Sequence, residues 1–119
     1  PLVDHEDPPT DEELVTGWTR VLRELDGFAS VRNRKVVLGE LGYPRSRYAA
    51  VRPWSYGEDR DAESLALQER CLELALDAVN TSGTLVGAFL WKWFPGEVSR
   101  GNFTKSTPEM RAVIRRHWK

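Results

Sequence analysis

The sequence predicts an α/β chain in which two parallel strands alternate with three amphipathic helices. Apolar residues recur at helical spacing in segments that begin near Thr10, Ala62 and Pro108. Two short apolar runs lie between these segments, Lys35–Leu41 and Thr84–Trp93. Both are typical of strands that are covered on both faces of a parallel sheet. The order helix, strand, helix, strand, helix indicates βαβ units with right-handed crossovers.

The first predicted helix begins at Thr10, which forms a capping box with Glu13, and ends between Gly27 and Arg32. Its apolar stripe is Leu14, Trp18, Val21, Leu22, Leu25 and Phe28. The preceding segment PLVDHEDPP holds four possible metal ligands, Asp4, His5, Glu6 and Asp7. Adjacent residues of an extended chain point in alternate directions, so we expect a solvated loop, and no metal or cofactor site is predicted.

The first strand, Lys35–Leu41, leads into residues 42–61, a connection rich in proline, glycine and aromatic residues. Such a connection is too long for a routine link between elements, and long ordered loops often line functional sites. The second helix spans residues 62–80 and ends before Gly83. The second strand, Thr84–Trp93, is followed by a loop over residues 94–107.

The last helix starts at Pro108, a favoured first helical position, and carries basic residues towards its carboxyl end. His117 lies in that same last turn, where a partial positive charge is favourable, so no catalytic role is expected for it.

Composition narrows the classes of partner. The 119 residues carry 17 basic and 18 acidic side chains and are 40% apolar, as in a small globular domain without the basic surface that nucleic acid requires. Cys71 is the only cysteine, so no intrachain disulfide can form. Neither a membrane span nor a signal peptide is visible, and the compartment stays undetermined. The five tryptophans favour either core packing or platforms for sugars.

Two strands alone cannot cover three amphipathic helices, and a two-stranded parallel ribbon leaves edges unpaired. We therefore expect these strands to dock beside others, which makes residues 1–119 a segment of a larger barrel. The chain also begins at Pro1 rather than at a methionine, which suggests a longer polypeptide.

Glu40 and Trp91 lie at the carboxyl ends of the two predicted strands, where ligands bind in parallel α/β folds. Neighbouring strands lie about 4.8 Å apart, so both side chains could share one sugar-sized pocket. A carboxylate at the end of an apolar strand is costly to desolvate, so it is expected to be held in an ion pair or to have a catalytic role. Glu40 is thus either catalytic or held in a structural ion pair; the candidate cations are Arg45, Arg47, Arg52 and Lys92.

The segments VVLGELGYPRS and LVGAFLWKWFPG, with the loop motif RPWSYG between them, resemble the last two strands of clan A glycoside hydrolases. The likeness is strongest to glycoside hydrolase family 113, the endo-β-1,4-mannanases. In that family a "(T/G)E(I/L)GY.S" segment ends the seventh barrel strand and supplies the nucleophile. The resemblance implies that Glu40 is this nucleophile, that Gly42 and Tyr43 complete the motif, and that Trp91 lies under the sugar at the cleavage point.

The same resemblance implies that residues 1–119 form the last quarter to third of a (β/α)8 TIM barrel: helix 6, strand 7, helix 7, strand 8 and helix 8. The general acid/base glutamate of the family lies on the fourth strand, which this chain lacks, so the chain alone is expected to be inactive. The implied mechanism is retaining hydrolysis of a β-linked, mannan-type polysaccharide. Tyr43 or Lys92 could keep Glu40 ionised.

Further aromatic residues could complete a binding site. Trp54 and Tyr56 could form a wall for sugar rings or pack the loop against its scaffold, and packing is favoured for Tyr56. Trp93 shares a face with Trp91 if the strand continues that far. The arginines of the loop, with Tyr48 and Trp54, also resemble the basic and aromatic mixture of nucleic-acid binders. Two other functions stay open: a non-catalytic carbohydrate-binding relative, and an α/β scaffold with Glu40 in a structural ion pair.

Overall fold

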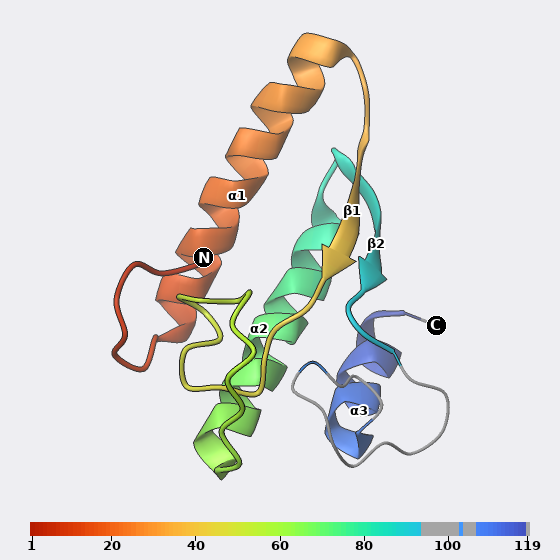
Figure 1. The fold of residues 1–119 in the computed structure, drawn as a ribbon. Helices are drawn as coiled ribbons and strands as arrows, with labels where there is room; N and C mark the ends of the chain where they lie inside the picture. The colour runs from red at the N-terminus through yellow and green to blue at the C-terminus, as the bar shows by residue number, and fades with distance from the viewer. Residues whose placement is uncertain (94–102, 104–106, 119) are drawn as a thin grey trace.

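The computed structural model describes residues 1–93, 103 and 107–118. The elements follow the order α1 (Asp11–Arg32), β1 (Val36–Leu41), α2 (Ala62–Thr81), β2 (Leu85–Leu90) and α3 (Pro108–His117). The two strands pair in parallel, which confirms the predicted α/β class and the alternation of helices and strands (Figure 1).

Local sequence explains where the helices begin. Thr10 caps α1 in the predicted capping box, in which its side chain accepts from the backbone N–H of Glu13 and the Glu13 carboxylate accepts in return. Asp61 caps α2 with its side chain, which accepts from the backbone N–H of Ser64, and Thr107 caps α3 just before Pro108. The predicted first residue of α3 is confirmed.

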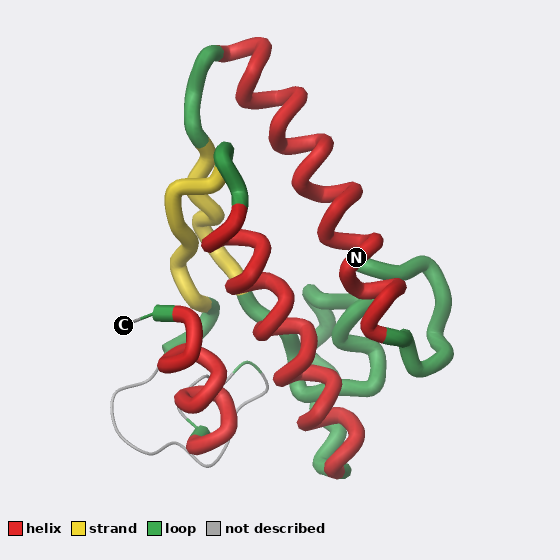
Figure 2. The backbone as a smooth tube through the Cα atoms, turned by 180° about the vertical axis from the view of Figure 1, so that it is seen from behind, coloured by secondary structure: helices red, strands yellow, loops and turns green. Residues whose placement is uncertain are grey.

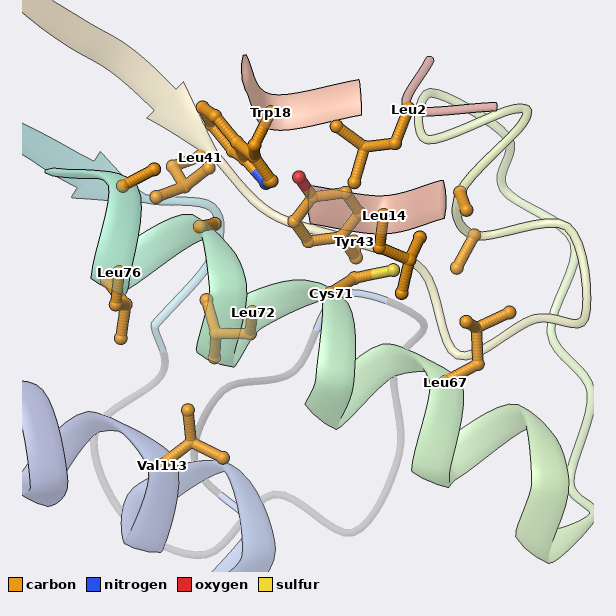
Figure 3. Close-up of a cluster of buried hydrophobic side chains, with 14 of the residues drawn as sticks. Leu2, Leu14, Trp18, Leu41, Tyr43, Leu67, Cys71, Leu72, Leu76 and Val113 are labelled. Carbon is orange, nitrogen blue, oxygen red and sulfur yellow. The ribbon is translucent and has the colours of Figure 1, made fainter. Parts of the chain in front are cut away.

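Helix α2 is the centre of the packing. It contacts α1, α3 and β2, and it lies behind the strands in Figure 1 and in front of them in Figure 2. Its buried side chains interlock with residues of α1, of the strand ends and of α3, as Figure 3 shows. The largest fully buried apolar side chains are Leu14, Leu72, Leu76, Met110 and Val113. Burial of this cluster supplies the main driving force for folding.

The strands are aligned irregularly, and this irregularity decides which side chains face the helices. Leu38 pairs with Ala88 and Leu41 with Leu90, so β1 uses one residue more than β2 over the same stretch. An extra residue of this kind is a β-bulge, and it reverses the alternation of side chains along the strand. Leu38 and Leu41 therefore both pack against the core although they are three positions apart.

The opposite face of the sheet is apolar and exposed within the described part of the chain. Val37 is 50% exposed, and on β2 Val86 and Phe89 are 63% and 69% exposed. Parallel sheets are normally covered on both faces, so this face has the composition of a buried surface.

The predicted starts of all three helices and both strands, and the ends of β1 and α2, are correct to within one residue, and α1 ends at the last residue of its predicted range; the end of β2 differs. The apolar run predicted a strand through Trp93, but β2 ends at Leu90. The backbone N–H of Trp91 donates to the carbonyl of Leu41 at 2.8 Å, and β1 ends at that same residue. Beyond this point β1 offers no partner for further pairing. None of the described helices is long and apolar enough to cross a membrane.

Candidate functional site

A pocket lies at the carboxyl ends of the two strands and contains both Glu40 and Trp91. Its volume is about 360 Å³, within the range of small-molecule sites. The other lining residues come from the strand ends and from two loops: Gly42, Pro53, Trp54, Tyr56 and Phe103. The structure thus brings together three of the predicted site residues, Glu40, Trp91 and Trp54.

Glu40 reaches this pocket because of the bulge in β1. Once Leu41 faces the core, Glu40 and Gly42 fall on the other side of the strand, and both line the pocket. The Glu40 side chain is exposed. Within the described residues it forms no salt bridge, so the structural ion pair that the sequence left open is not observed there.

The three arginines proposed as ion-pair partners contact other groups. Arg52 pairs with Glu6, and the Arg45 guanidinium donates to the carbonyl of Arg60 at 2.9 Å. Arg47 lies over the ring of Tyr48, with 5.0 Å from its central carbon to the ring centroid. The Arg45 and Arg47 contacts lie within residues 44–61, and Arg52 joins this segment to the N-terminal residues; none of the three contacts involves Glu40.

Close approach of the two strand ends positions Trp91. A Cβ atom at Gly42 would overlap the carbonyl oxygen of Trp91, so only glycine allows this approach. The peptide bond between Trp91 and Lys92 is cis. The Lys92 ammonium lies 5.7 Å from the centroid of the Trp91 ring, and the Lys92 backbone N–H donates to the carbonyl of Phe103 at 3.1 Å. Lys92 therefore borders Trp91 without lining the pocket.

Trp54 and Tyr56 form the loop side of the pocket. Both rings are largely exposed, Trp54 at 64% and Tyr56 at 74%. Tyr56 meets the ring of Phe103 edge-on, at 5.5 Å between centroids. Tyr56 thus contacts Phe103 and also lines the pocket. Pro53 and Phe103 were not assigned to a site from the sequence, and Gly42 was named only as part of the strand-end motif.

Tyr43 lies outside the pocket, in the core between α1 and α2. It is 4% exposed, and Figure 3 shows its ring between these helices with its hydroxyl towards the indole nitrogen of Trp18. Burial, with a smaller electrostatic contribution from Cys71, raises the pKa of the hydroxyl far above its ordinary value. Tyr43 follows Leu41 by two residues and shares its face, so the structure does not bring it to Glu40.

Trp93 also lies apart from this pocket. Because β2 ends at Leu90, the predicted shared face of Trp91 and Trp93 does not extend this far. The Arg111 guanidinium of α3 lies 5.0 Å from the centroid of the Trp93 ring, which is 46% exposed.

The other clusters singled out in the sequence have structural partners. His5 hydrogen-bonds to Glu13 at 3.1 Å, and Glu6 pairs with Arg52, so the acidic N-terminal segment does not converge on one point. Over the described residues, no group of histidine, cysteine and carboxylate side chains could hold a metal ion. His117 contacts Glu73 at 2.7 Å and joins α3 to α2.

A larger pocket, of about 630 Å³, lies beside the start of α2. Its lining mixes carboxylates with two arginines, and one of these, Arg70, is already paired with Asp11 at 2.7 Å. We favour the strand-end pocket as the functional site because it combines exposed aromatic rings with a carboxylate that has no salt bridge to the described residues, at the end of the sheet where ligands bind.

This arrangement offers one carboxylate and flat apolar surfaces. Glu40 can accept hydrogen bonds from hydroxyl groups or act as a nucleophile, and the indoles can stack on a weakly charged ring. Among the described lining residues Glu40 is the one carboxylate. Comparisons of the chain with models of protein families, with curated proteins and with solved structures found no match.

Proposed function

We propose that this chain supplies the nucleophile side of the active site of a retaining β-glycoside hydrolase, with a mannan-type polysaccharide as the favoured substrate. The observation that carries the proposal is the shared pocket of Glu40, Trp91 and Trp54. It joins a carboxylate without a salt bridge, within the described residues, to two indoles. The sequence resemblance to family 113 assigns the nucleophile and the sugar platform to Glu40 and Trp91.

In the proposed reaction a Glu40 oxygen attacks the anomeric carbon of the sugar and forms a glycosyl ester. The bond from this carbon to the leaving oxygen breaks, and a carboxylic acid outside residues 1–119 donates its proton to that oxygen. Water then hydrolyses the ester with the same outer group as base. In retaining enzymes the two carboxyl groups lie about 5 to 5.5 Å apart, which sets where the outer group must lie relative to Glu40.

We further propose that α1 to α3 with β1 and β2 form part of a (β/α)8 barrel, in which other parallel strands cover the exposed sheet face. The apolar side chains Val37, Val86 and Phe89 support this arrangement. They would line the barrel interior, while α2 lies on the outside, and Glu40 and Trp91 would lie at the end of the barrel where active sites form. The remaining strands would come from the same polypeptide or from a companion chain.

The nucleophile can be tested without the missing acid. A 2-deoxy-2-fluoro-β-mannosyl fluoride releases fluoride with its bonding electron pair, so the leaving group needs no proton. We expect incubation with the full polypeptide that carries residues 1–119 to add one fluoromannosyl group, and peptide mass spectrometry to locate it on Glu40. Glu40→Gln should abolish both this label and the hydrolysis of mannan, while manno-oligosaccharide binding by calorimetry persists.

Glu58→Gln is the matched control, because Glu58 is an exposed carboxylate of the neighbouring loop that does not line the pocket. It should label like the parent protein. Hydrolysis that survives Glu40→Gln, or a label on another residue, would refute the nucleophile assignment.

A second candidate function is carbohydrate binding without catalysis. It is favoured by the exposed rings of Trp54 and Tyr56 and by the presence of a single carboxylate, Glu40, among the described residues that line the pocket. In that case manno-oligosaccharides bind to the polypeptide and to Glu40→Gln alike, and the fluoride reagent leaves no label. The same two measurements therefore separate the candidates.

A further inference from the structure

The loop that carries Trp54 and Tyr56 is closed at its base by Asp59, next to the hydrogen bond from the Arg45 guanidinium to the carbonyl of Arg60. The Asp59 Oδ2 atom accepts a hydrogen bond from the Ser46 hydroxyl at 3.0 Å and another from the backbone N–H of Arg47 at 2.9 Å. The backbone N–H of Asp59 donates to the carbonyl of Arg45 at 2.9 Å. Three contacts of one residue thus join the outgoing end of the loop to its incoming end.

The surroundings fix this closure in place. Ser46 is 2% exposed, and its hydroxyl oxygen also accepts from the backbone N–H of Tyr48 at 3.2 Å. Removal of the Asp59 carboxylate would leave the buried Ser46 hydroxyl without its acceptor, which is more costly than the loss of an exposed hydrogen bond.

Between the two joined ends, the chain turns back in short steps. The backbone N–H of Arg52 donates to the carbonyl of Tyr48 at 2.8 Å, and that of Ser55 donates to the carbonyl of Arg52 at 2.9 Å. Trp54 and Tyr56 lie in this segment, and both line the Glu40 pocket. Loss of the Asp59 contacts would loosen the closure of the loop that carries these two rings.

From this geometry we infer that Asp59 is a positioning residue, which sets the aromatic wall opposite Trp91 and thereby the affinity of the pocket for a chain of neutral sugar rings. The inference deepens the proposed function and rests on it for the identity of the ligand. Asp59 itself is absent from the pocket lining and would act through Trp54 and Tyr56.

The first test follows the rings without any ligand. Indole N–H resonances in ¹⁵N-labelled protein are assigned by Trp→Phe variants. In Asp59→Ala we expect the Trp54 resonance to shift or broaden while that of Trp18, in the core, stays in place. Asp59→Asn keeps an amide oxygen that can accept both hydrogen bonds, so it should restore the Trp54 resonance. Glu58→Gln, one residue earlier, should leave both resonances unchanged.

The second test measures mannohexaose affinity by calorimetry. Asp59→Ala should weaken binding by about five- to tenfold, the effect of roughly one hydrogen bond's free energy. In a double variant that lacks both aromatic rings, Trp54→Ala with Tyr56→Ala, Asp59→Ala should change the affinity by less than about twofold. The effects of coupled residues on affinity are not additive, and Asp59 would have no rings left to position.

The inference would be overturned if Asp59→Ala caused an equal loss of affinity in the parent protein and in the variant without the two rings, or if it left the Trp54 resonance unchanged. A shifted Trp18 resonance in Asp59→Ala would mean that the core itself is disturbed. In that case both tests are repeated with Ser46→Ala, which removes only one of the two hydrogen bonds to the Asp59 carboxylate. If the parent protein does not bind mannohexaose, the proposed function fails, while the resonance test still decides the role of Asp59.

Discussion

Substitution of Gly42 by alanine should separate the ends of the two strands. The added Cβ atom would overlap the carbonyl oxygen of Trp91, which is backbone and cannot rotate away. The hydrogen bond from the Trp91 N–H to the Leu41 carbonyl lies beside this contact, at 2.8 Å. The variant must therefore lengthen this bond or shift Trp91 relative to Glu40.

The expected cost follows from the geometry. Extra atoms forced into a packed site cost about 1 to 3 kcal/mol. Unfolding entropy scales with chain length to about 0.25 kcal/mol/K for a chain of this size, so the melting temperature should fall by roughly 4 to 12 °C. Displacement of Trp91 should in addition weaken binding of manno-oligosaccharides, if the proposed function holds.

Gly39→Ala provides the matched control on the same strand. A Cβ atom at Gly39 would meet nothing within 4 Å, so this variant should melt within about 2 °C of the parent protein. Both melts are followed by circular dichroism under one set of conditions. Equal melting temperatures for the two variants would show that close approach of the strand ends does not depend on Gly42.

Two further predictions concern stability away from the pocket. Thr10→Ala removes the α1 cap and should lower the free energy of unfolding by about 0.5 to 2 kcal/mol, as measured by urea titration; an unchanged midpoint would contradict it. Hydrogen bonds from Arg116 hold the pKa of Glu73 below its ordinary value of 4.5. A lowered folded-state pKa adds stability above the unfolded-state pKa, and this stability is lost as the pH falls through the folded-state pKa. Arg116→Gln should therefore reduce the loss of melting temperature between about pH 6 and pH 3, and an identical pH profile would refute this assignment.

Element order and helix starts could be predicted because they depend on nearby residues. Thr10 and Glu13 form a cap that is encoded within four positions, and Pro108 marks the first turn of α3 through its own geometry. The end of β2 could not be predicted in this way. The apolar run of β2 does not reveal how long its partner strand is, and β2 ends at the last residue that pairs with β1.

The candidate site shows the same division. Glu40 and Trp91 could be identified because they lie at the predicted carboxyl ends of the strands. The face on which Glu40 lies depends on a bulge, which the alternation of side chains along a strand does not predict. One signal in the sequence was not used, the alternation of side chains along an extended chain. Leu41 is apolar and faces the core, so Tyr43, two residues later, shares its face and Glu40 lies on the other face. Asp59 was missed because its partners are twelve and thirteen positions away, in a loop without periodicity.

The exposed sheet face links this fold to the proposed barrel. Phe89 is 69% exposed among the described residues, although it lies on a strand of a parallel sheet. If other strands cover it, the ring is buried in the full polypeptide and its truncation leaves a cavity. If water covers it, truncation removes few contacts.

Phe89→Ala in the full polypeptide decides between these cases. Truncation of a buried phenylalanine costs about 3 to 5 kcal/mol, whereas a surface substitution stays within about 0.5 kcal/mol. Val31→Ala is the control, since Val31 is 84% exposed near the end of α1, on the outer layer of the proposed barrel. We expect a large loss of unfolding free energy for Phe89→Ala and a negligible one for Val31→Ala in guanidinium titrations. Equal, small losses would mean that solvent covers this face, and the barrel would then have to be abandoned even if Glu40 proved to be a nucleophile.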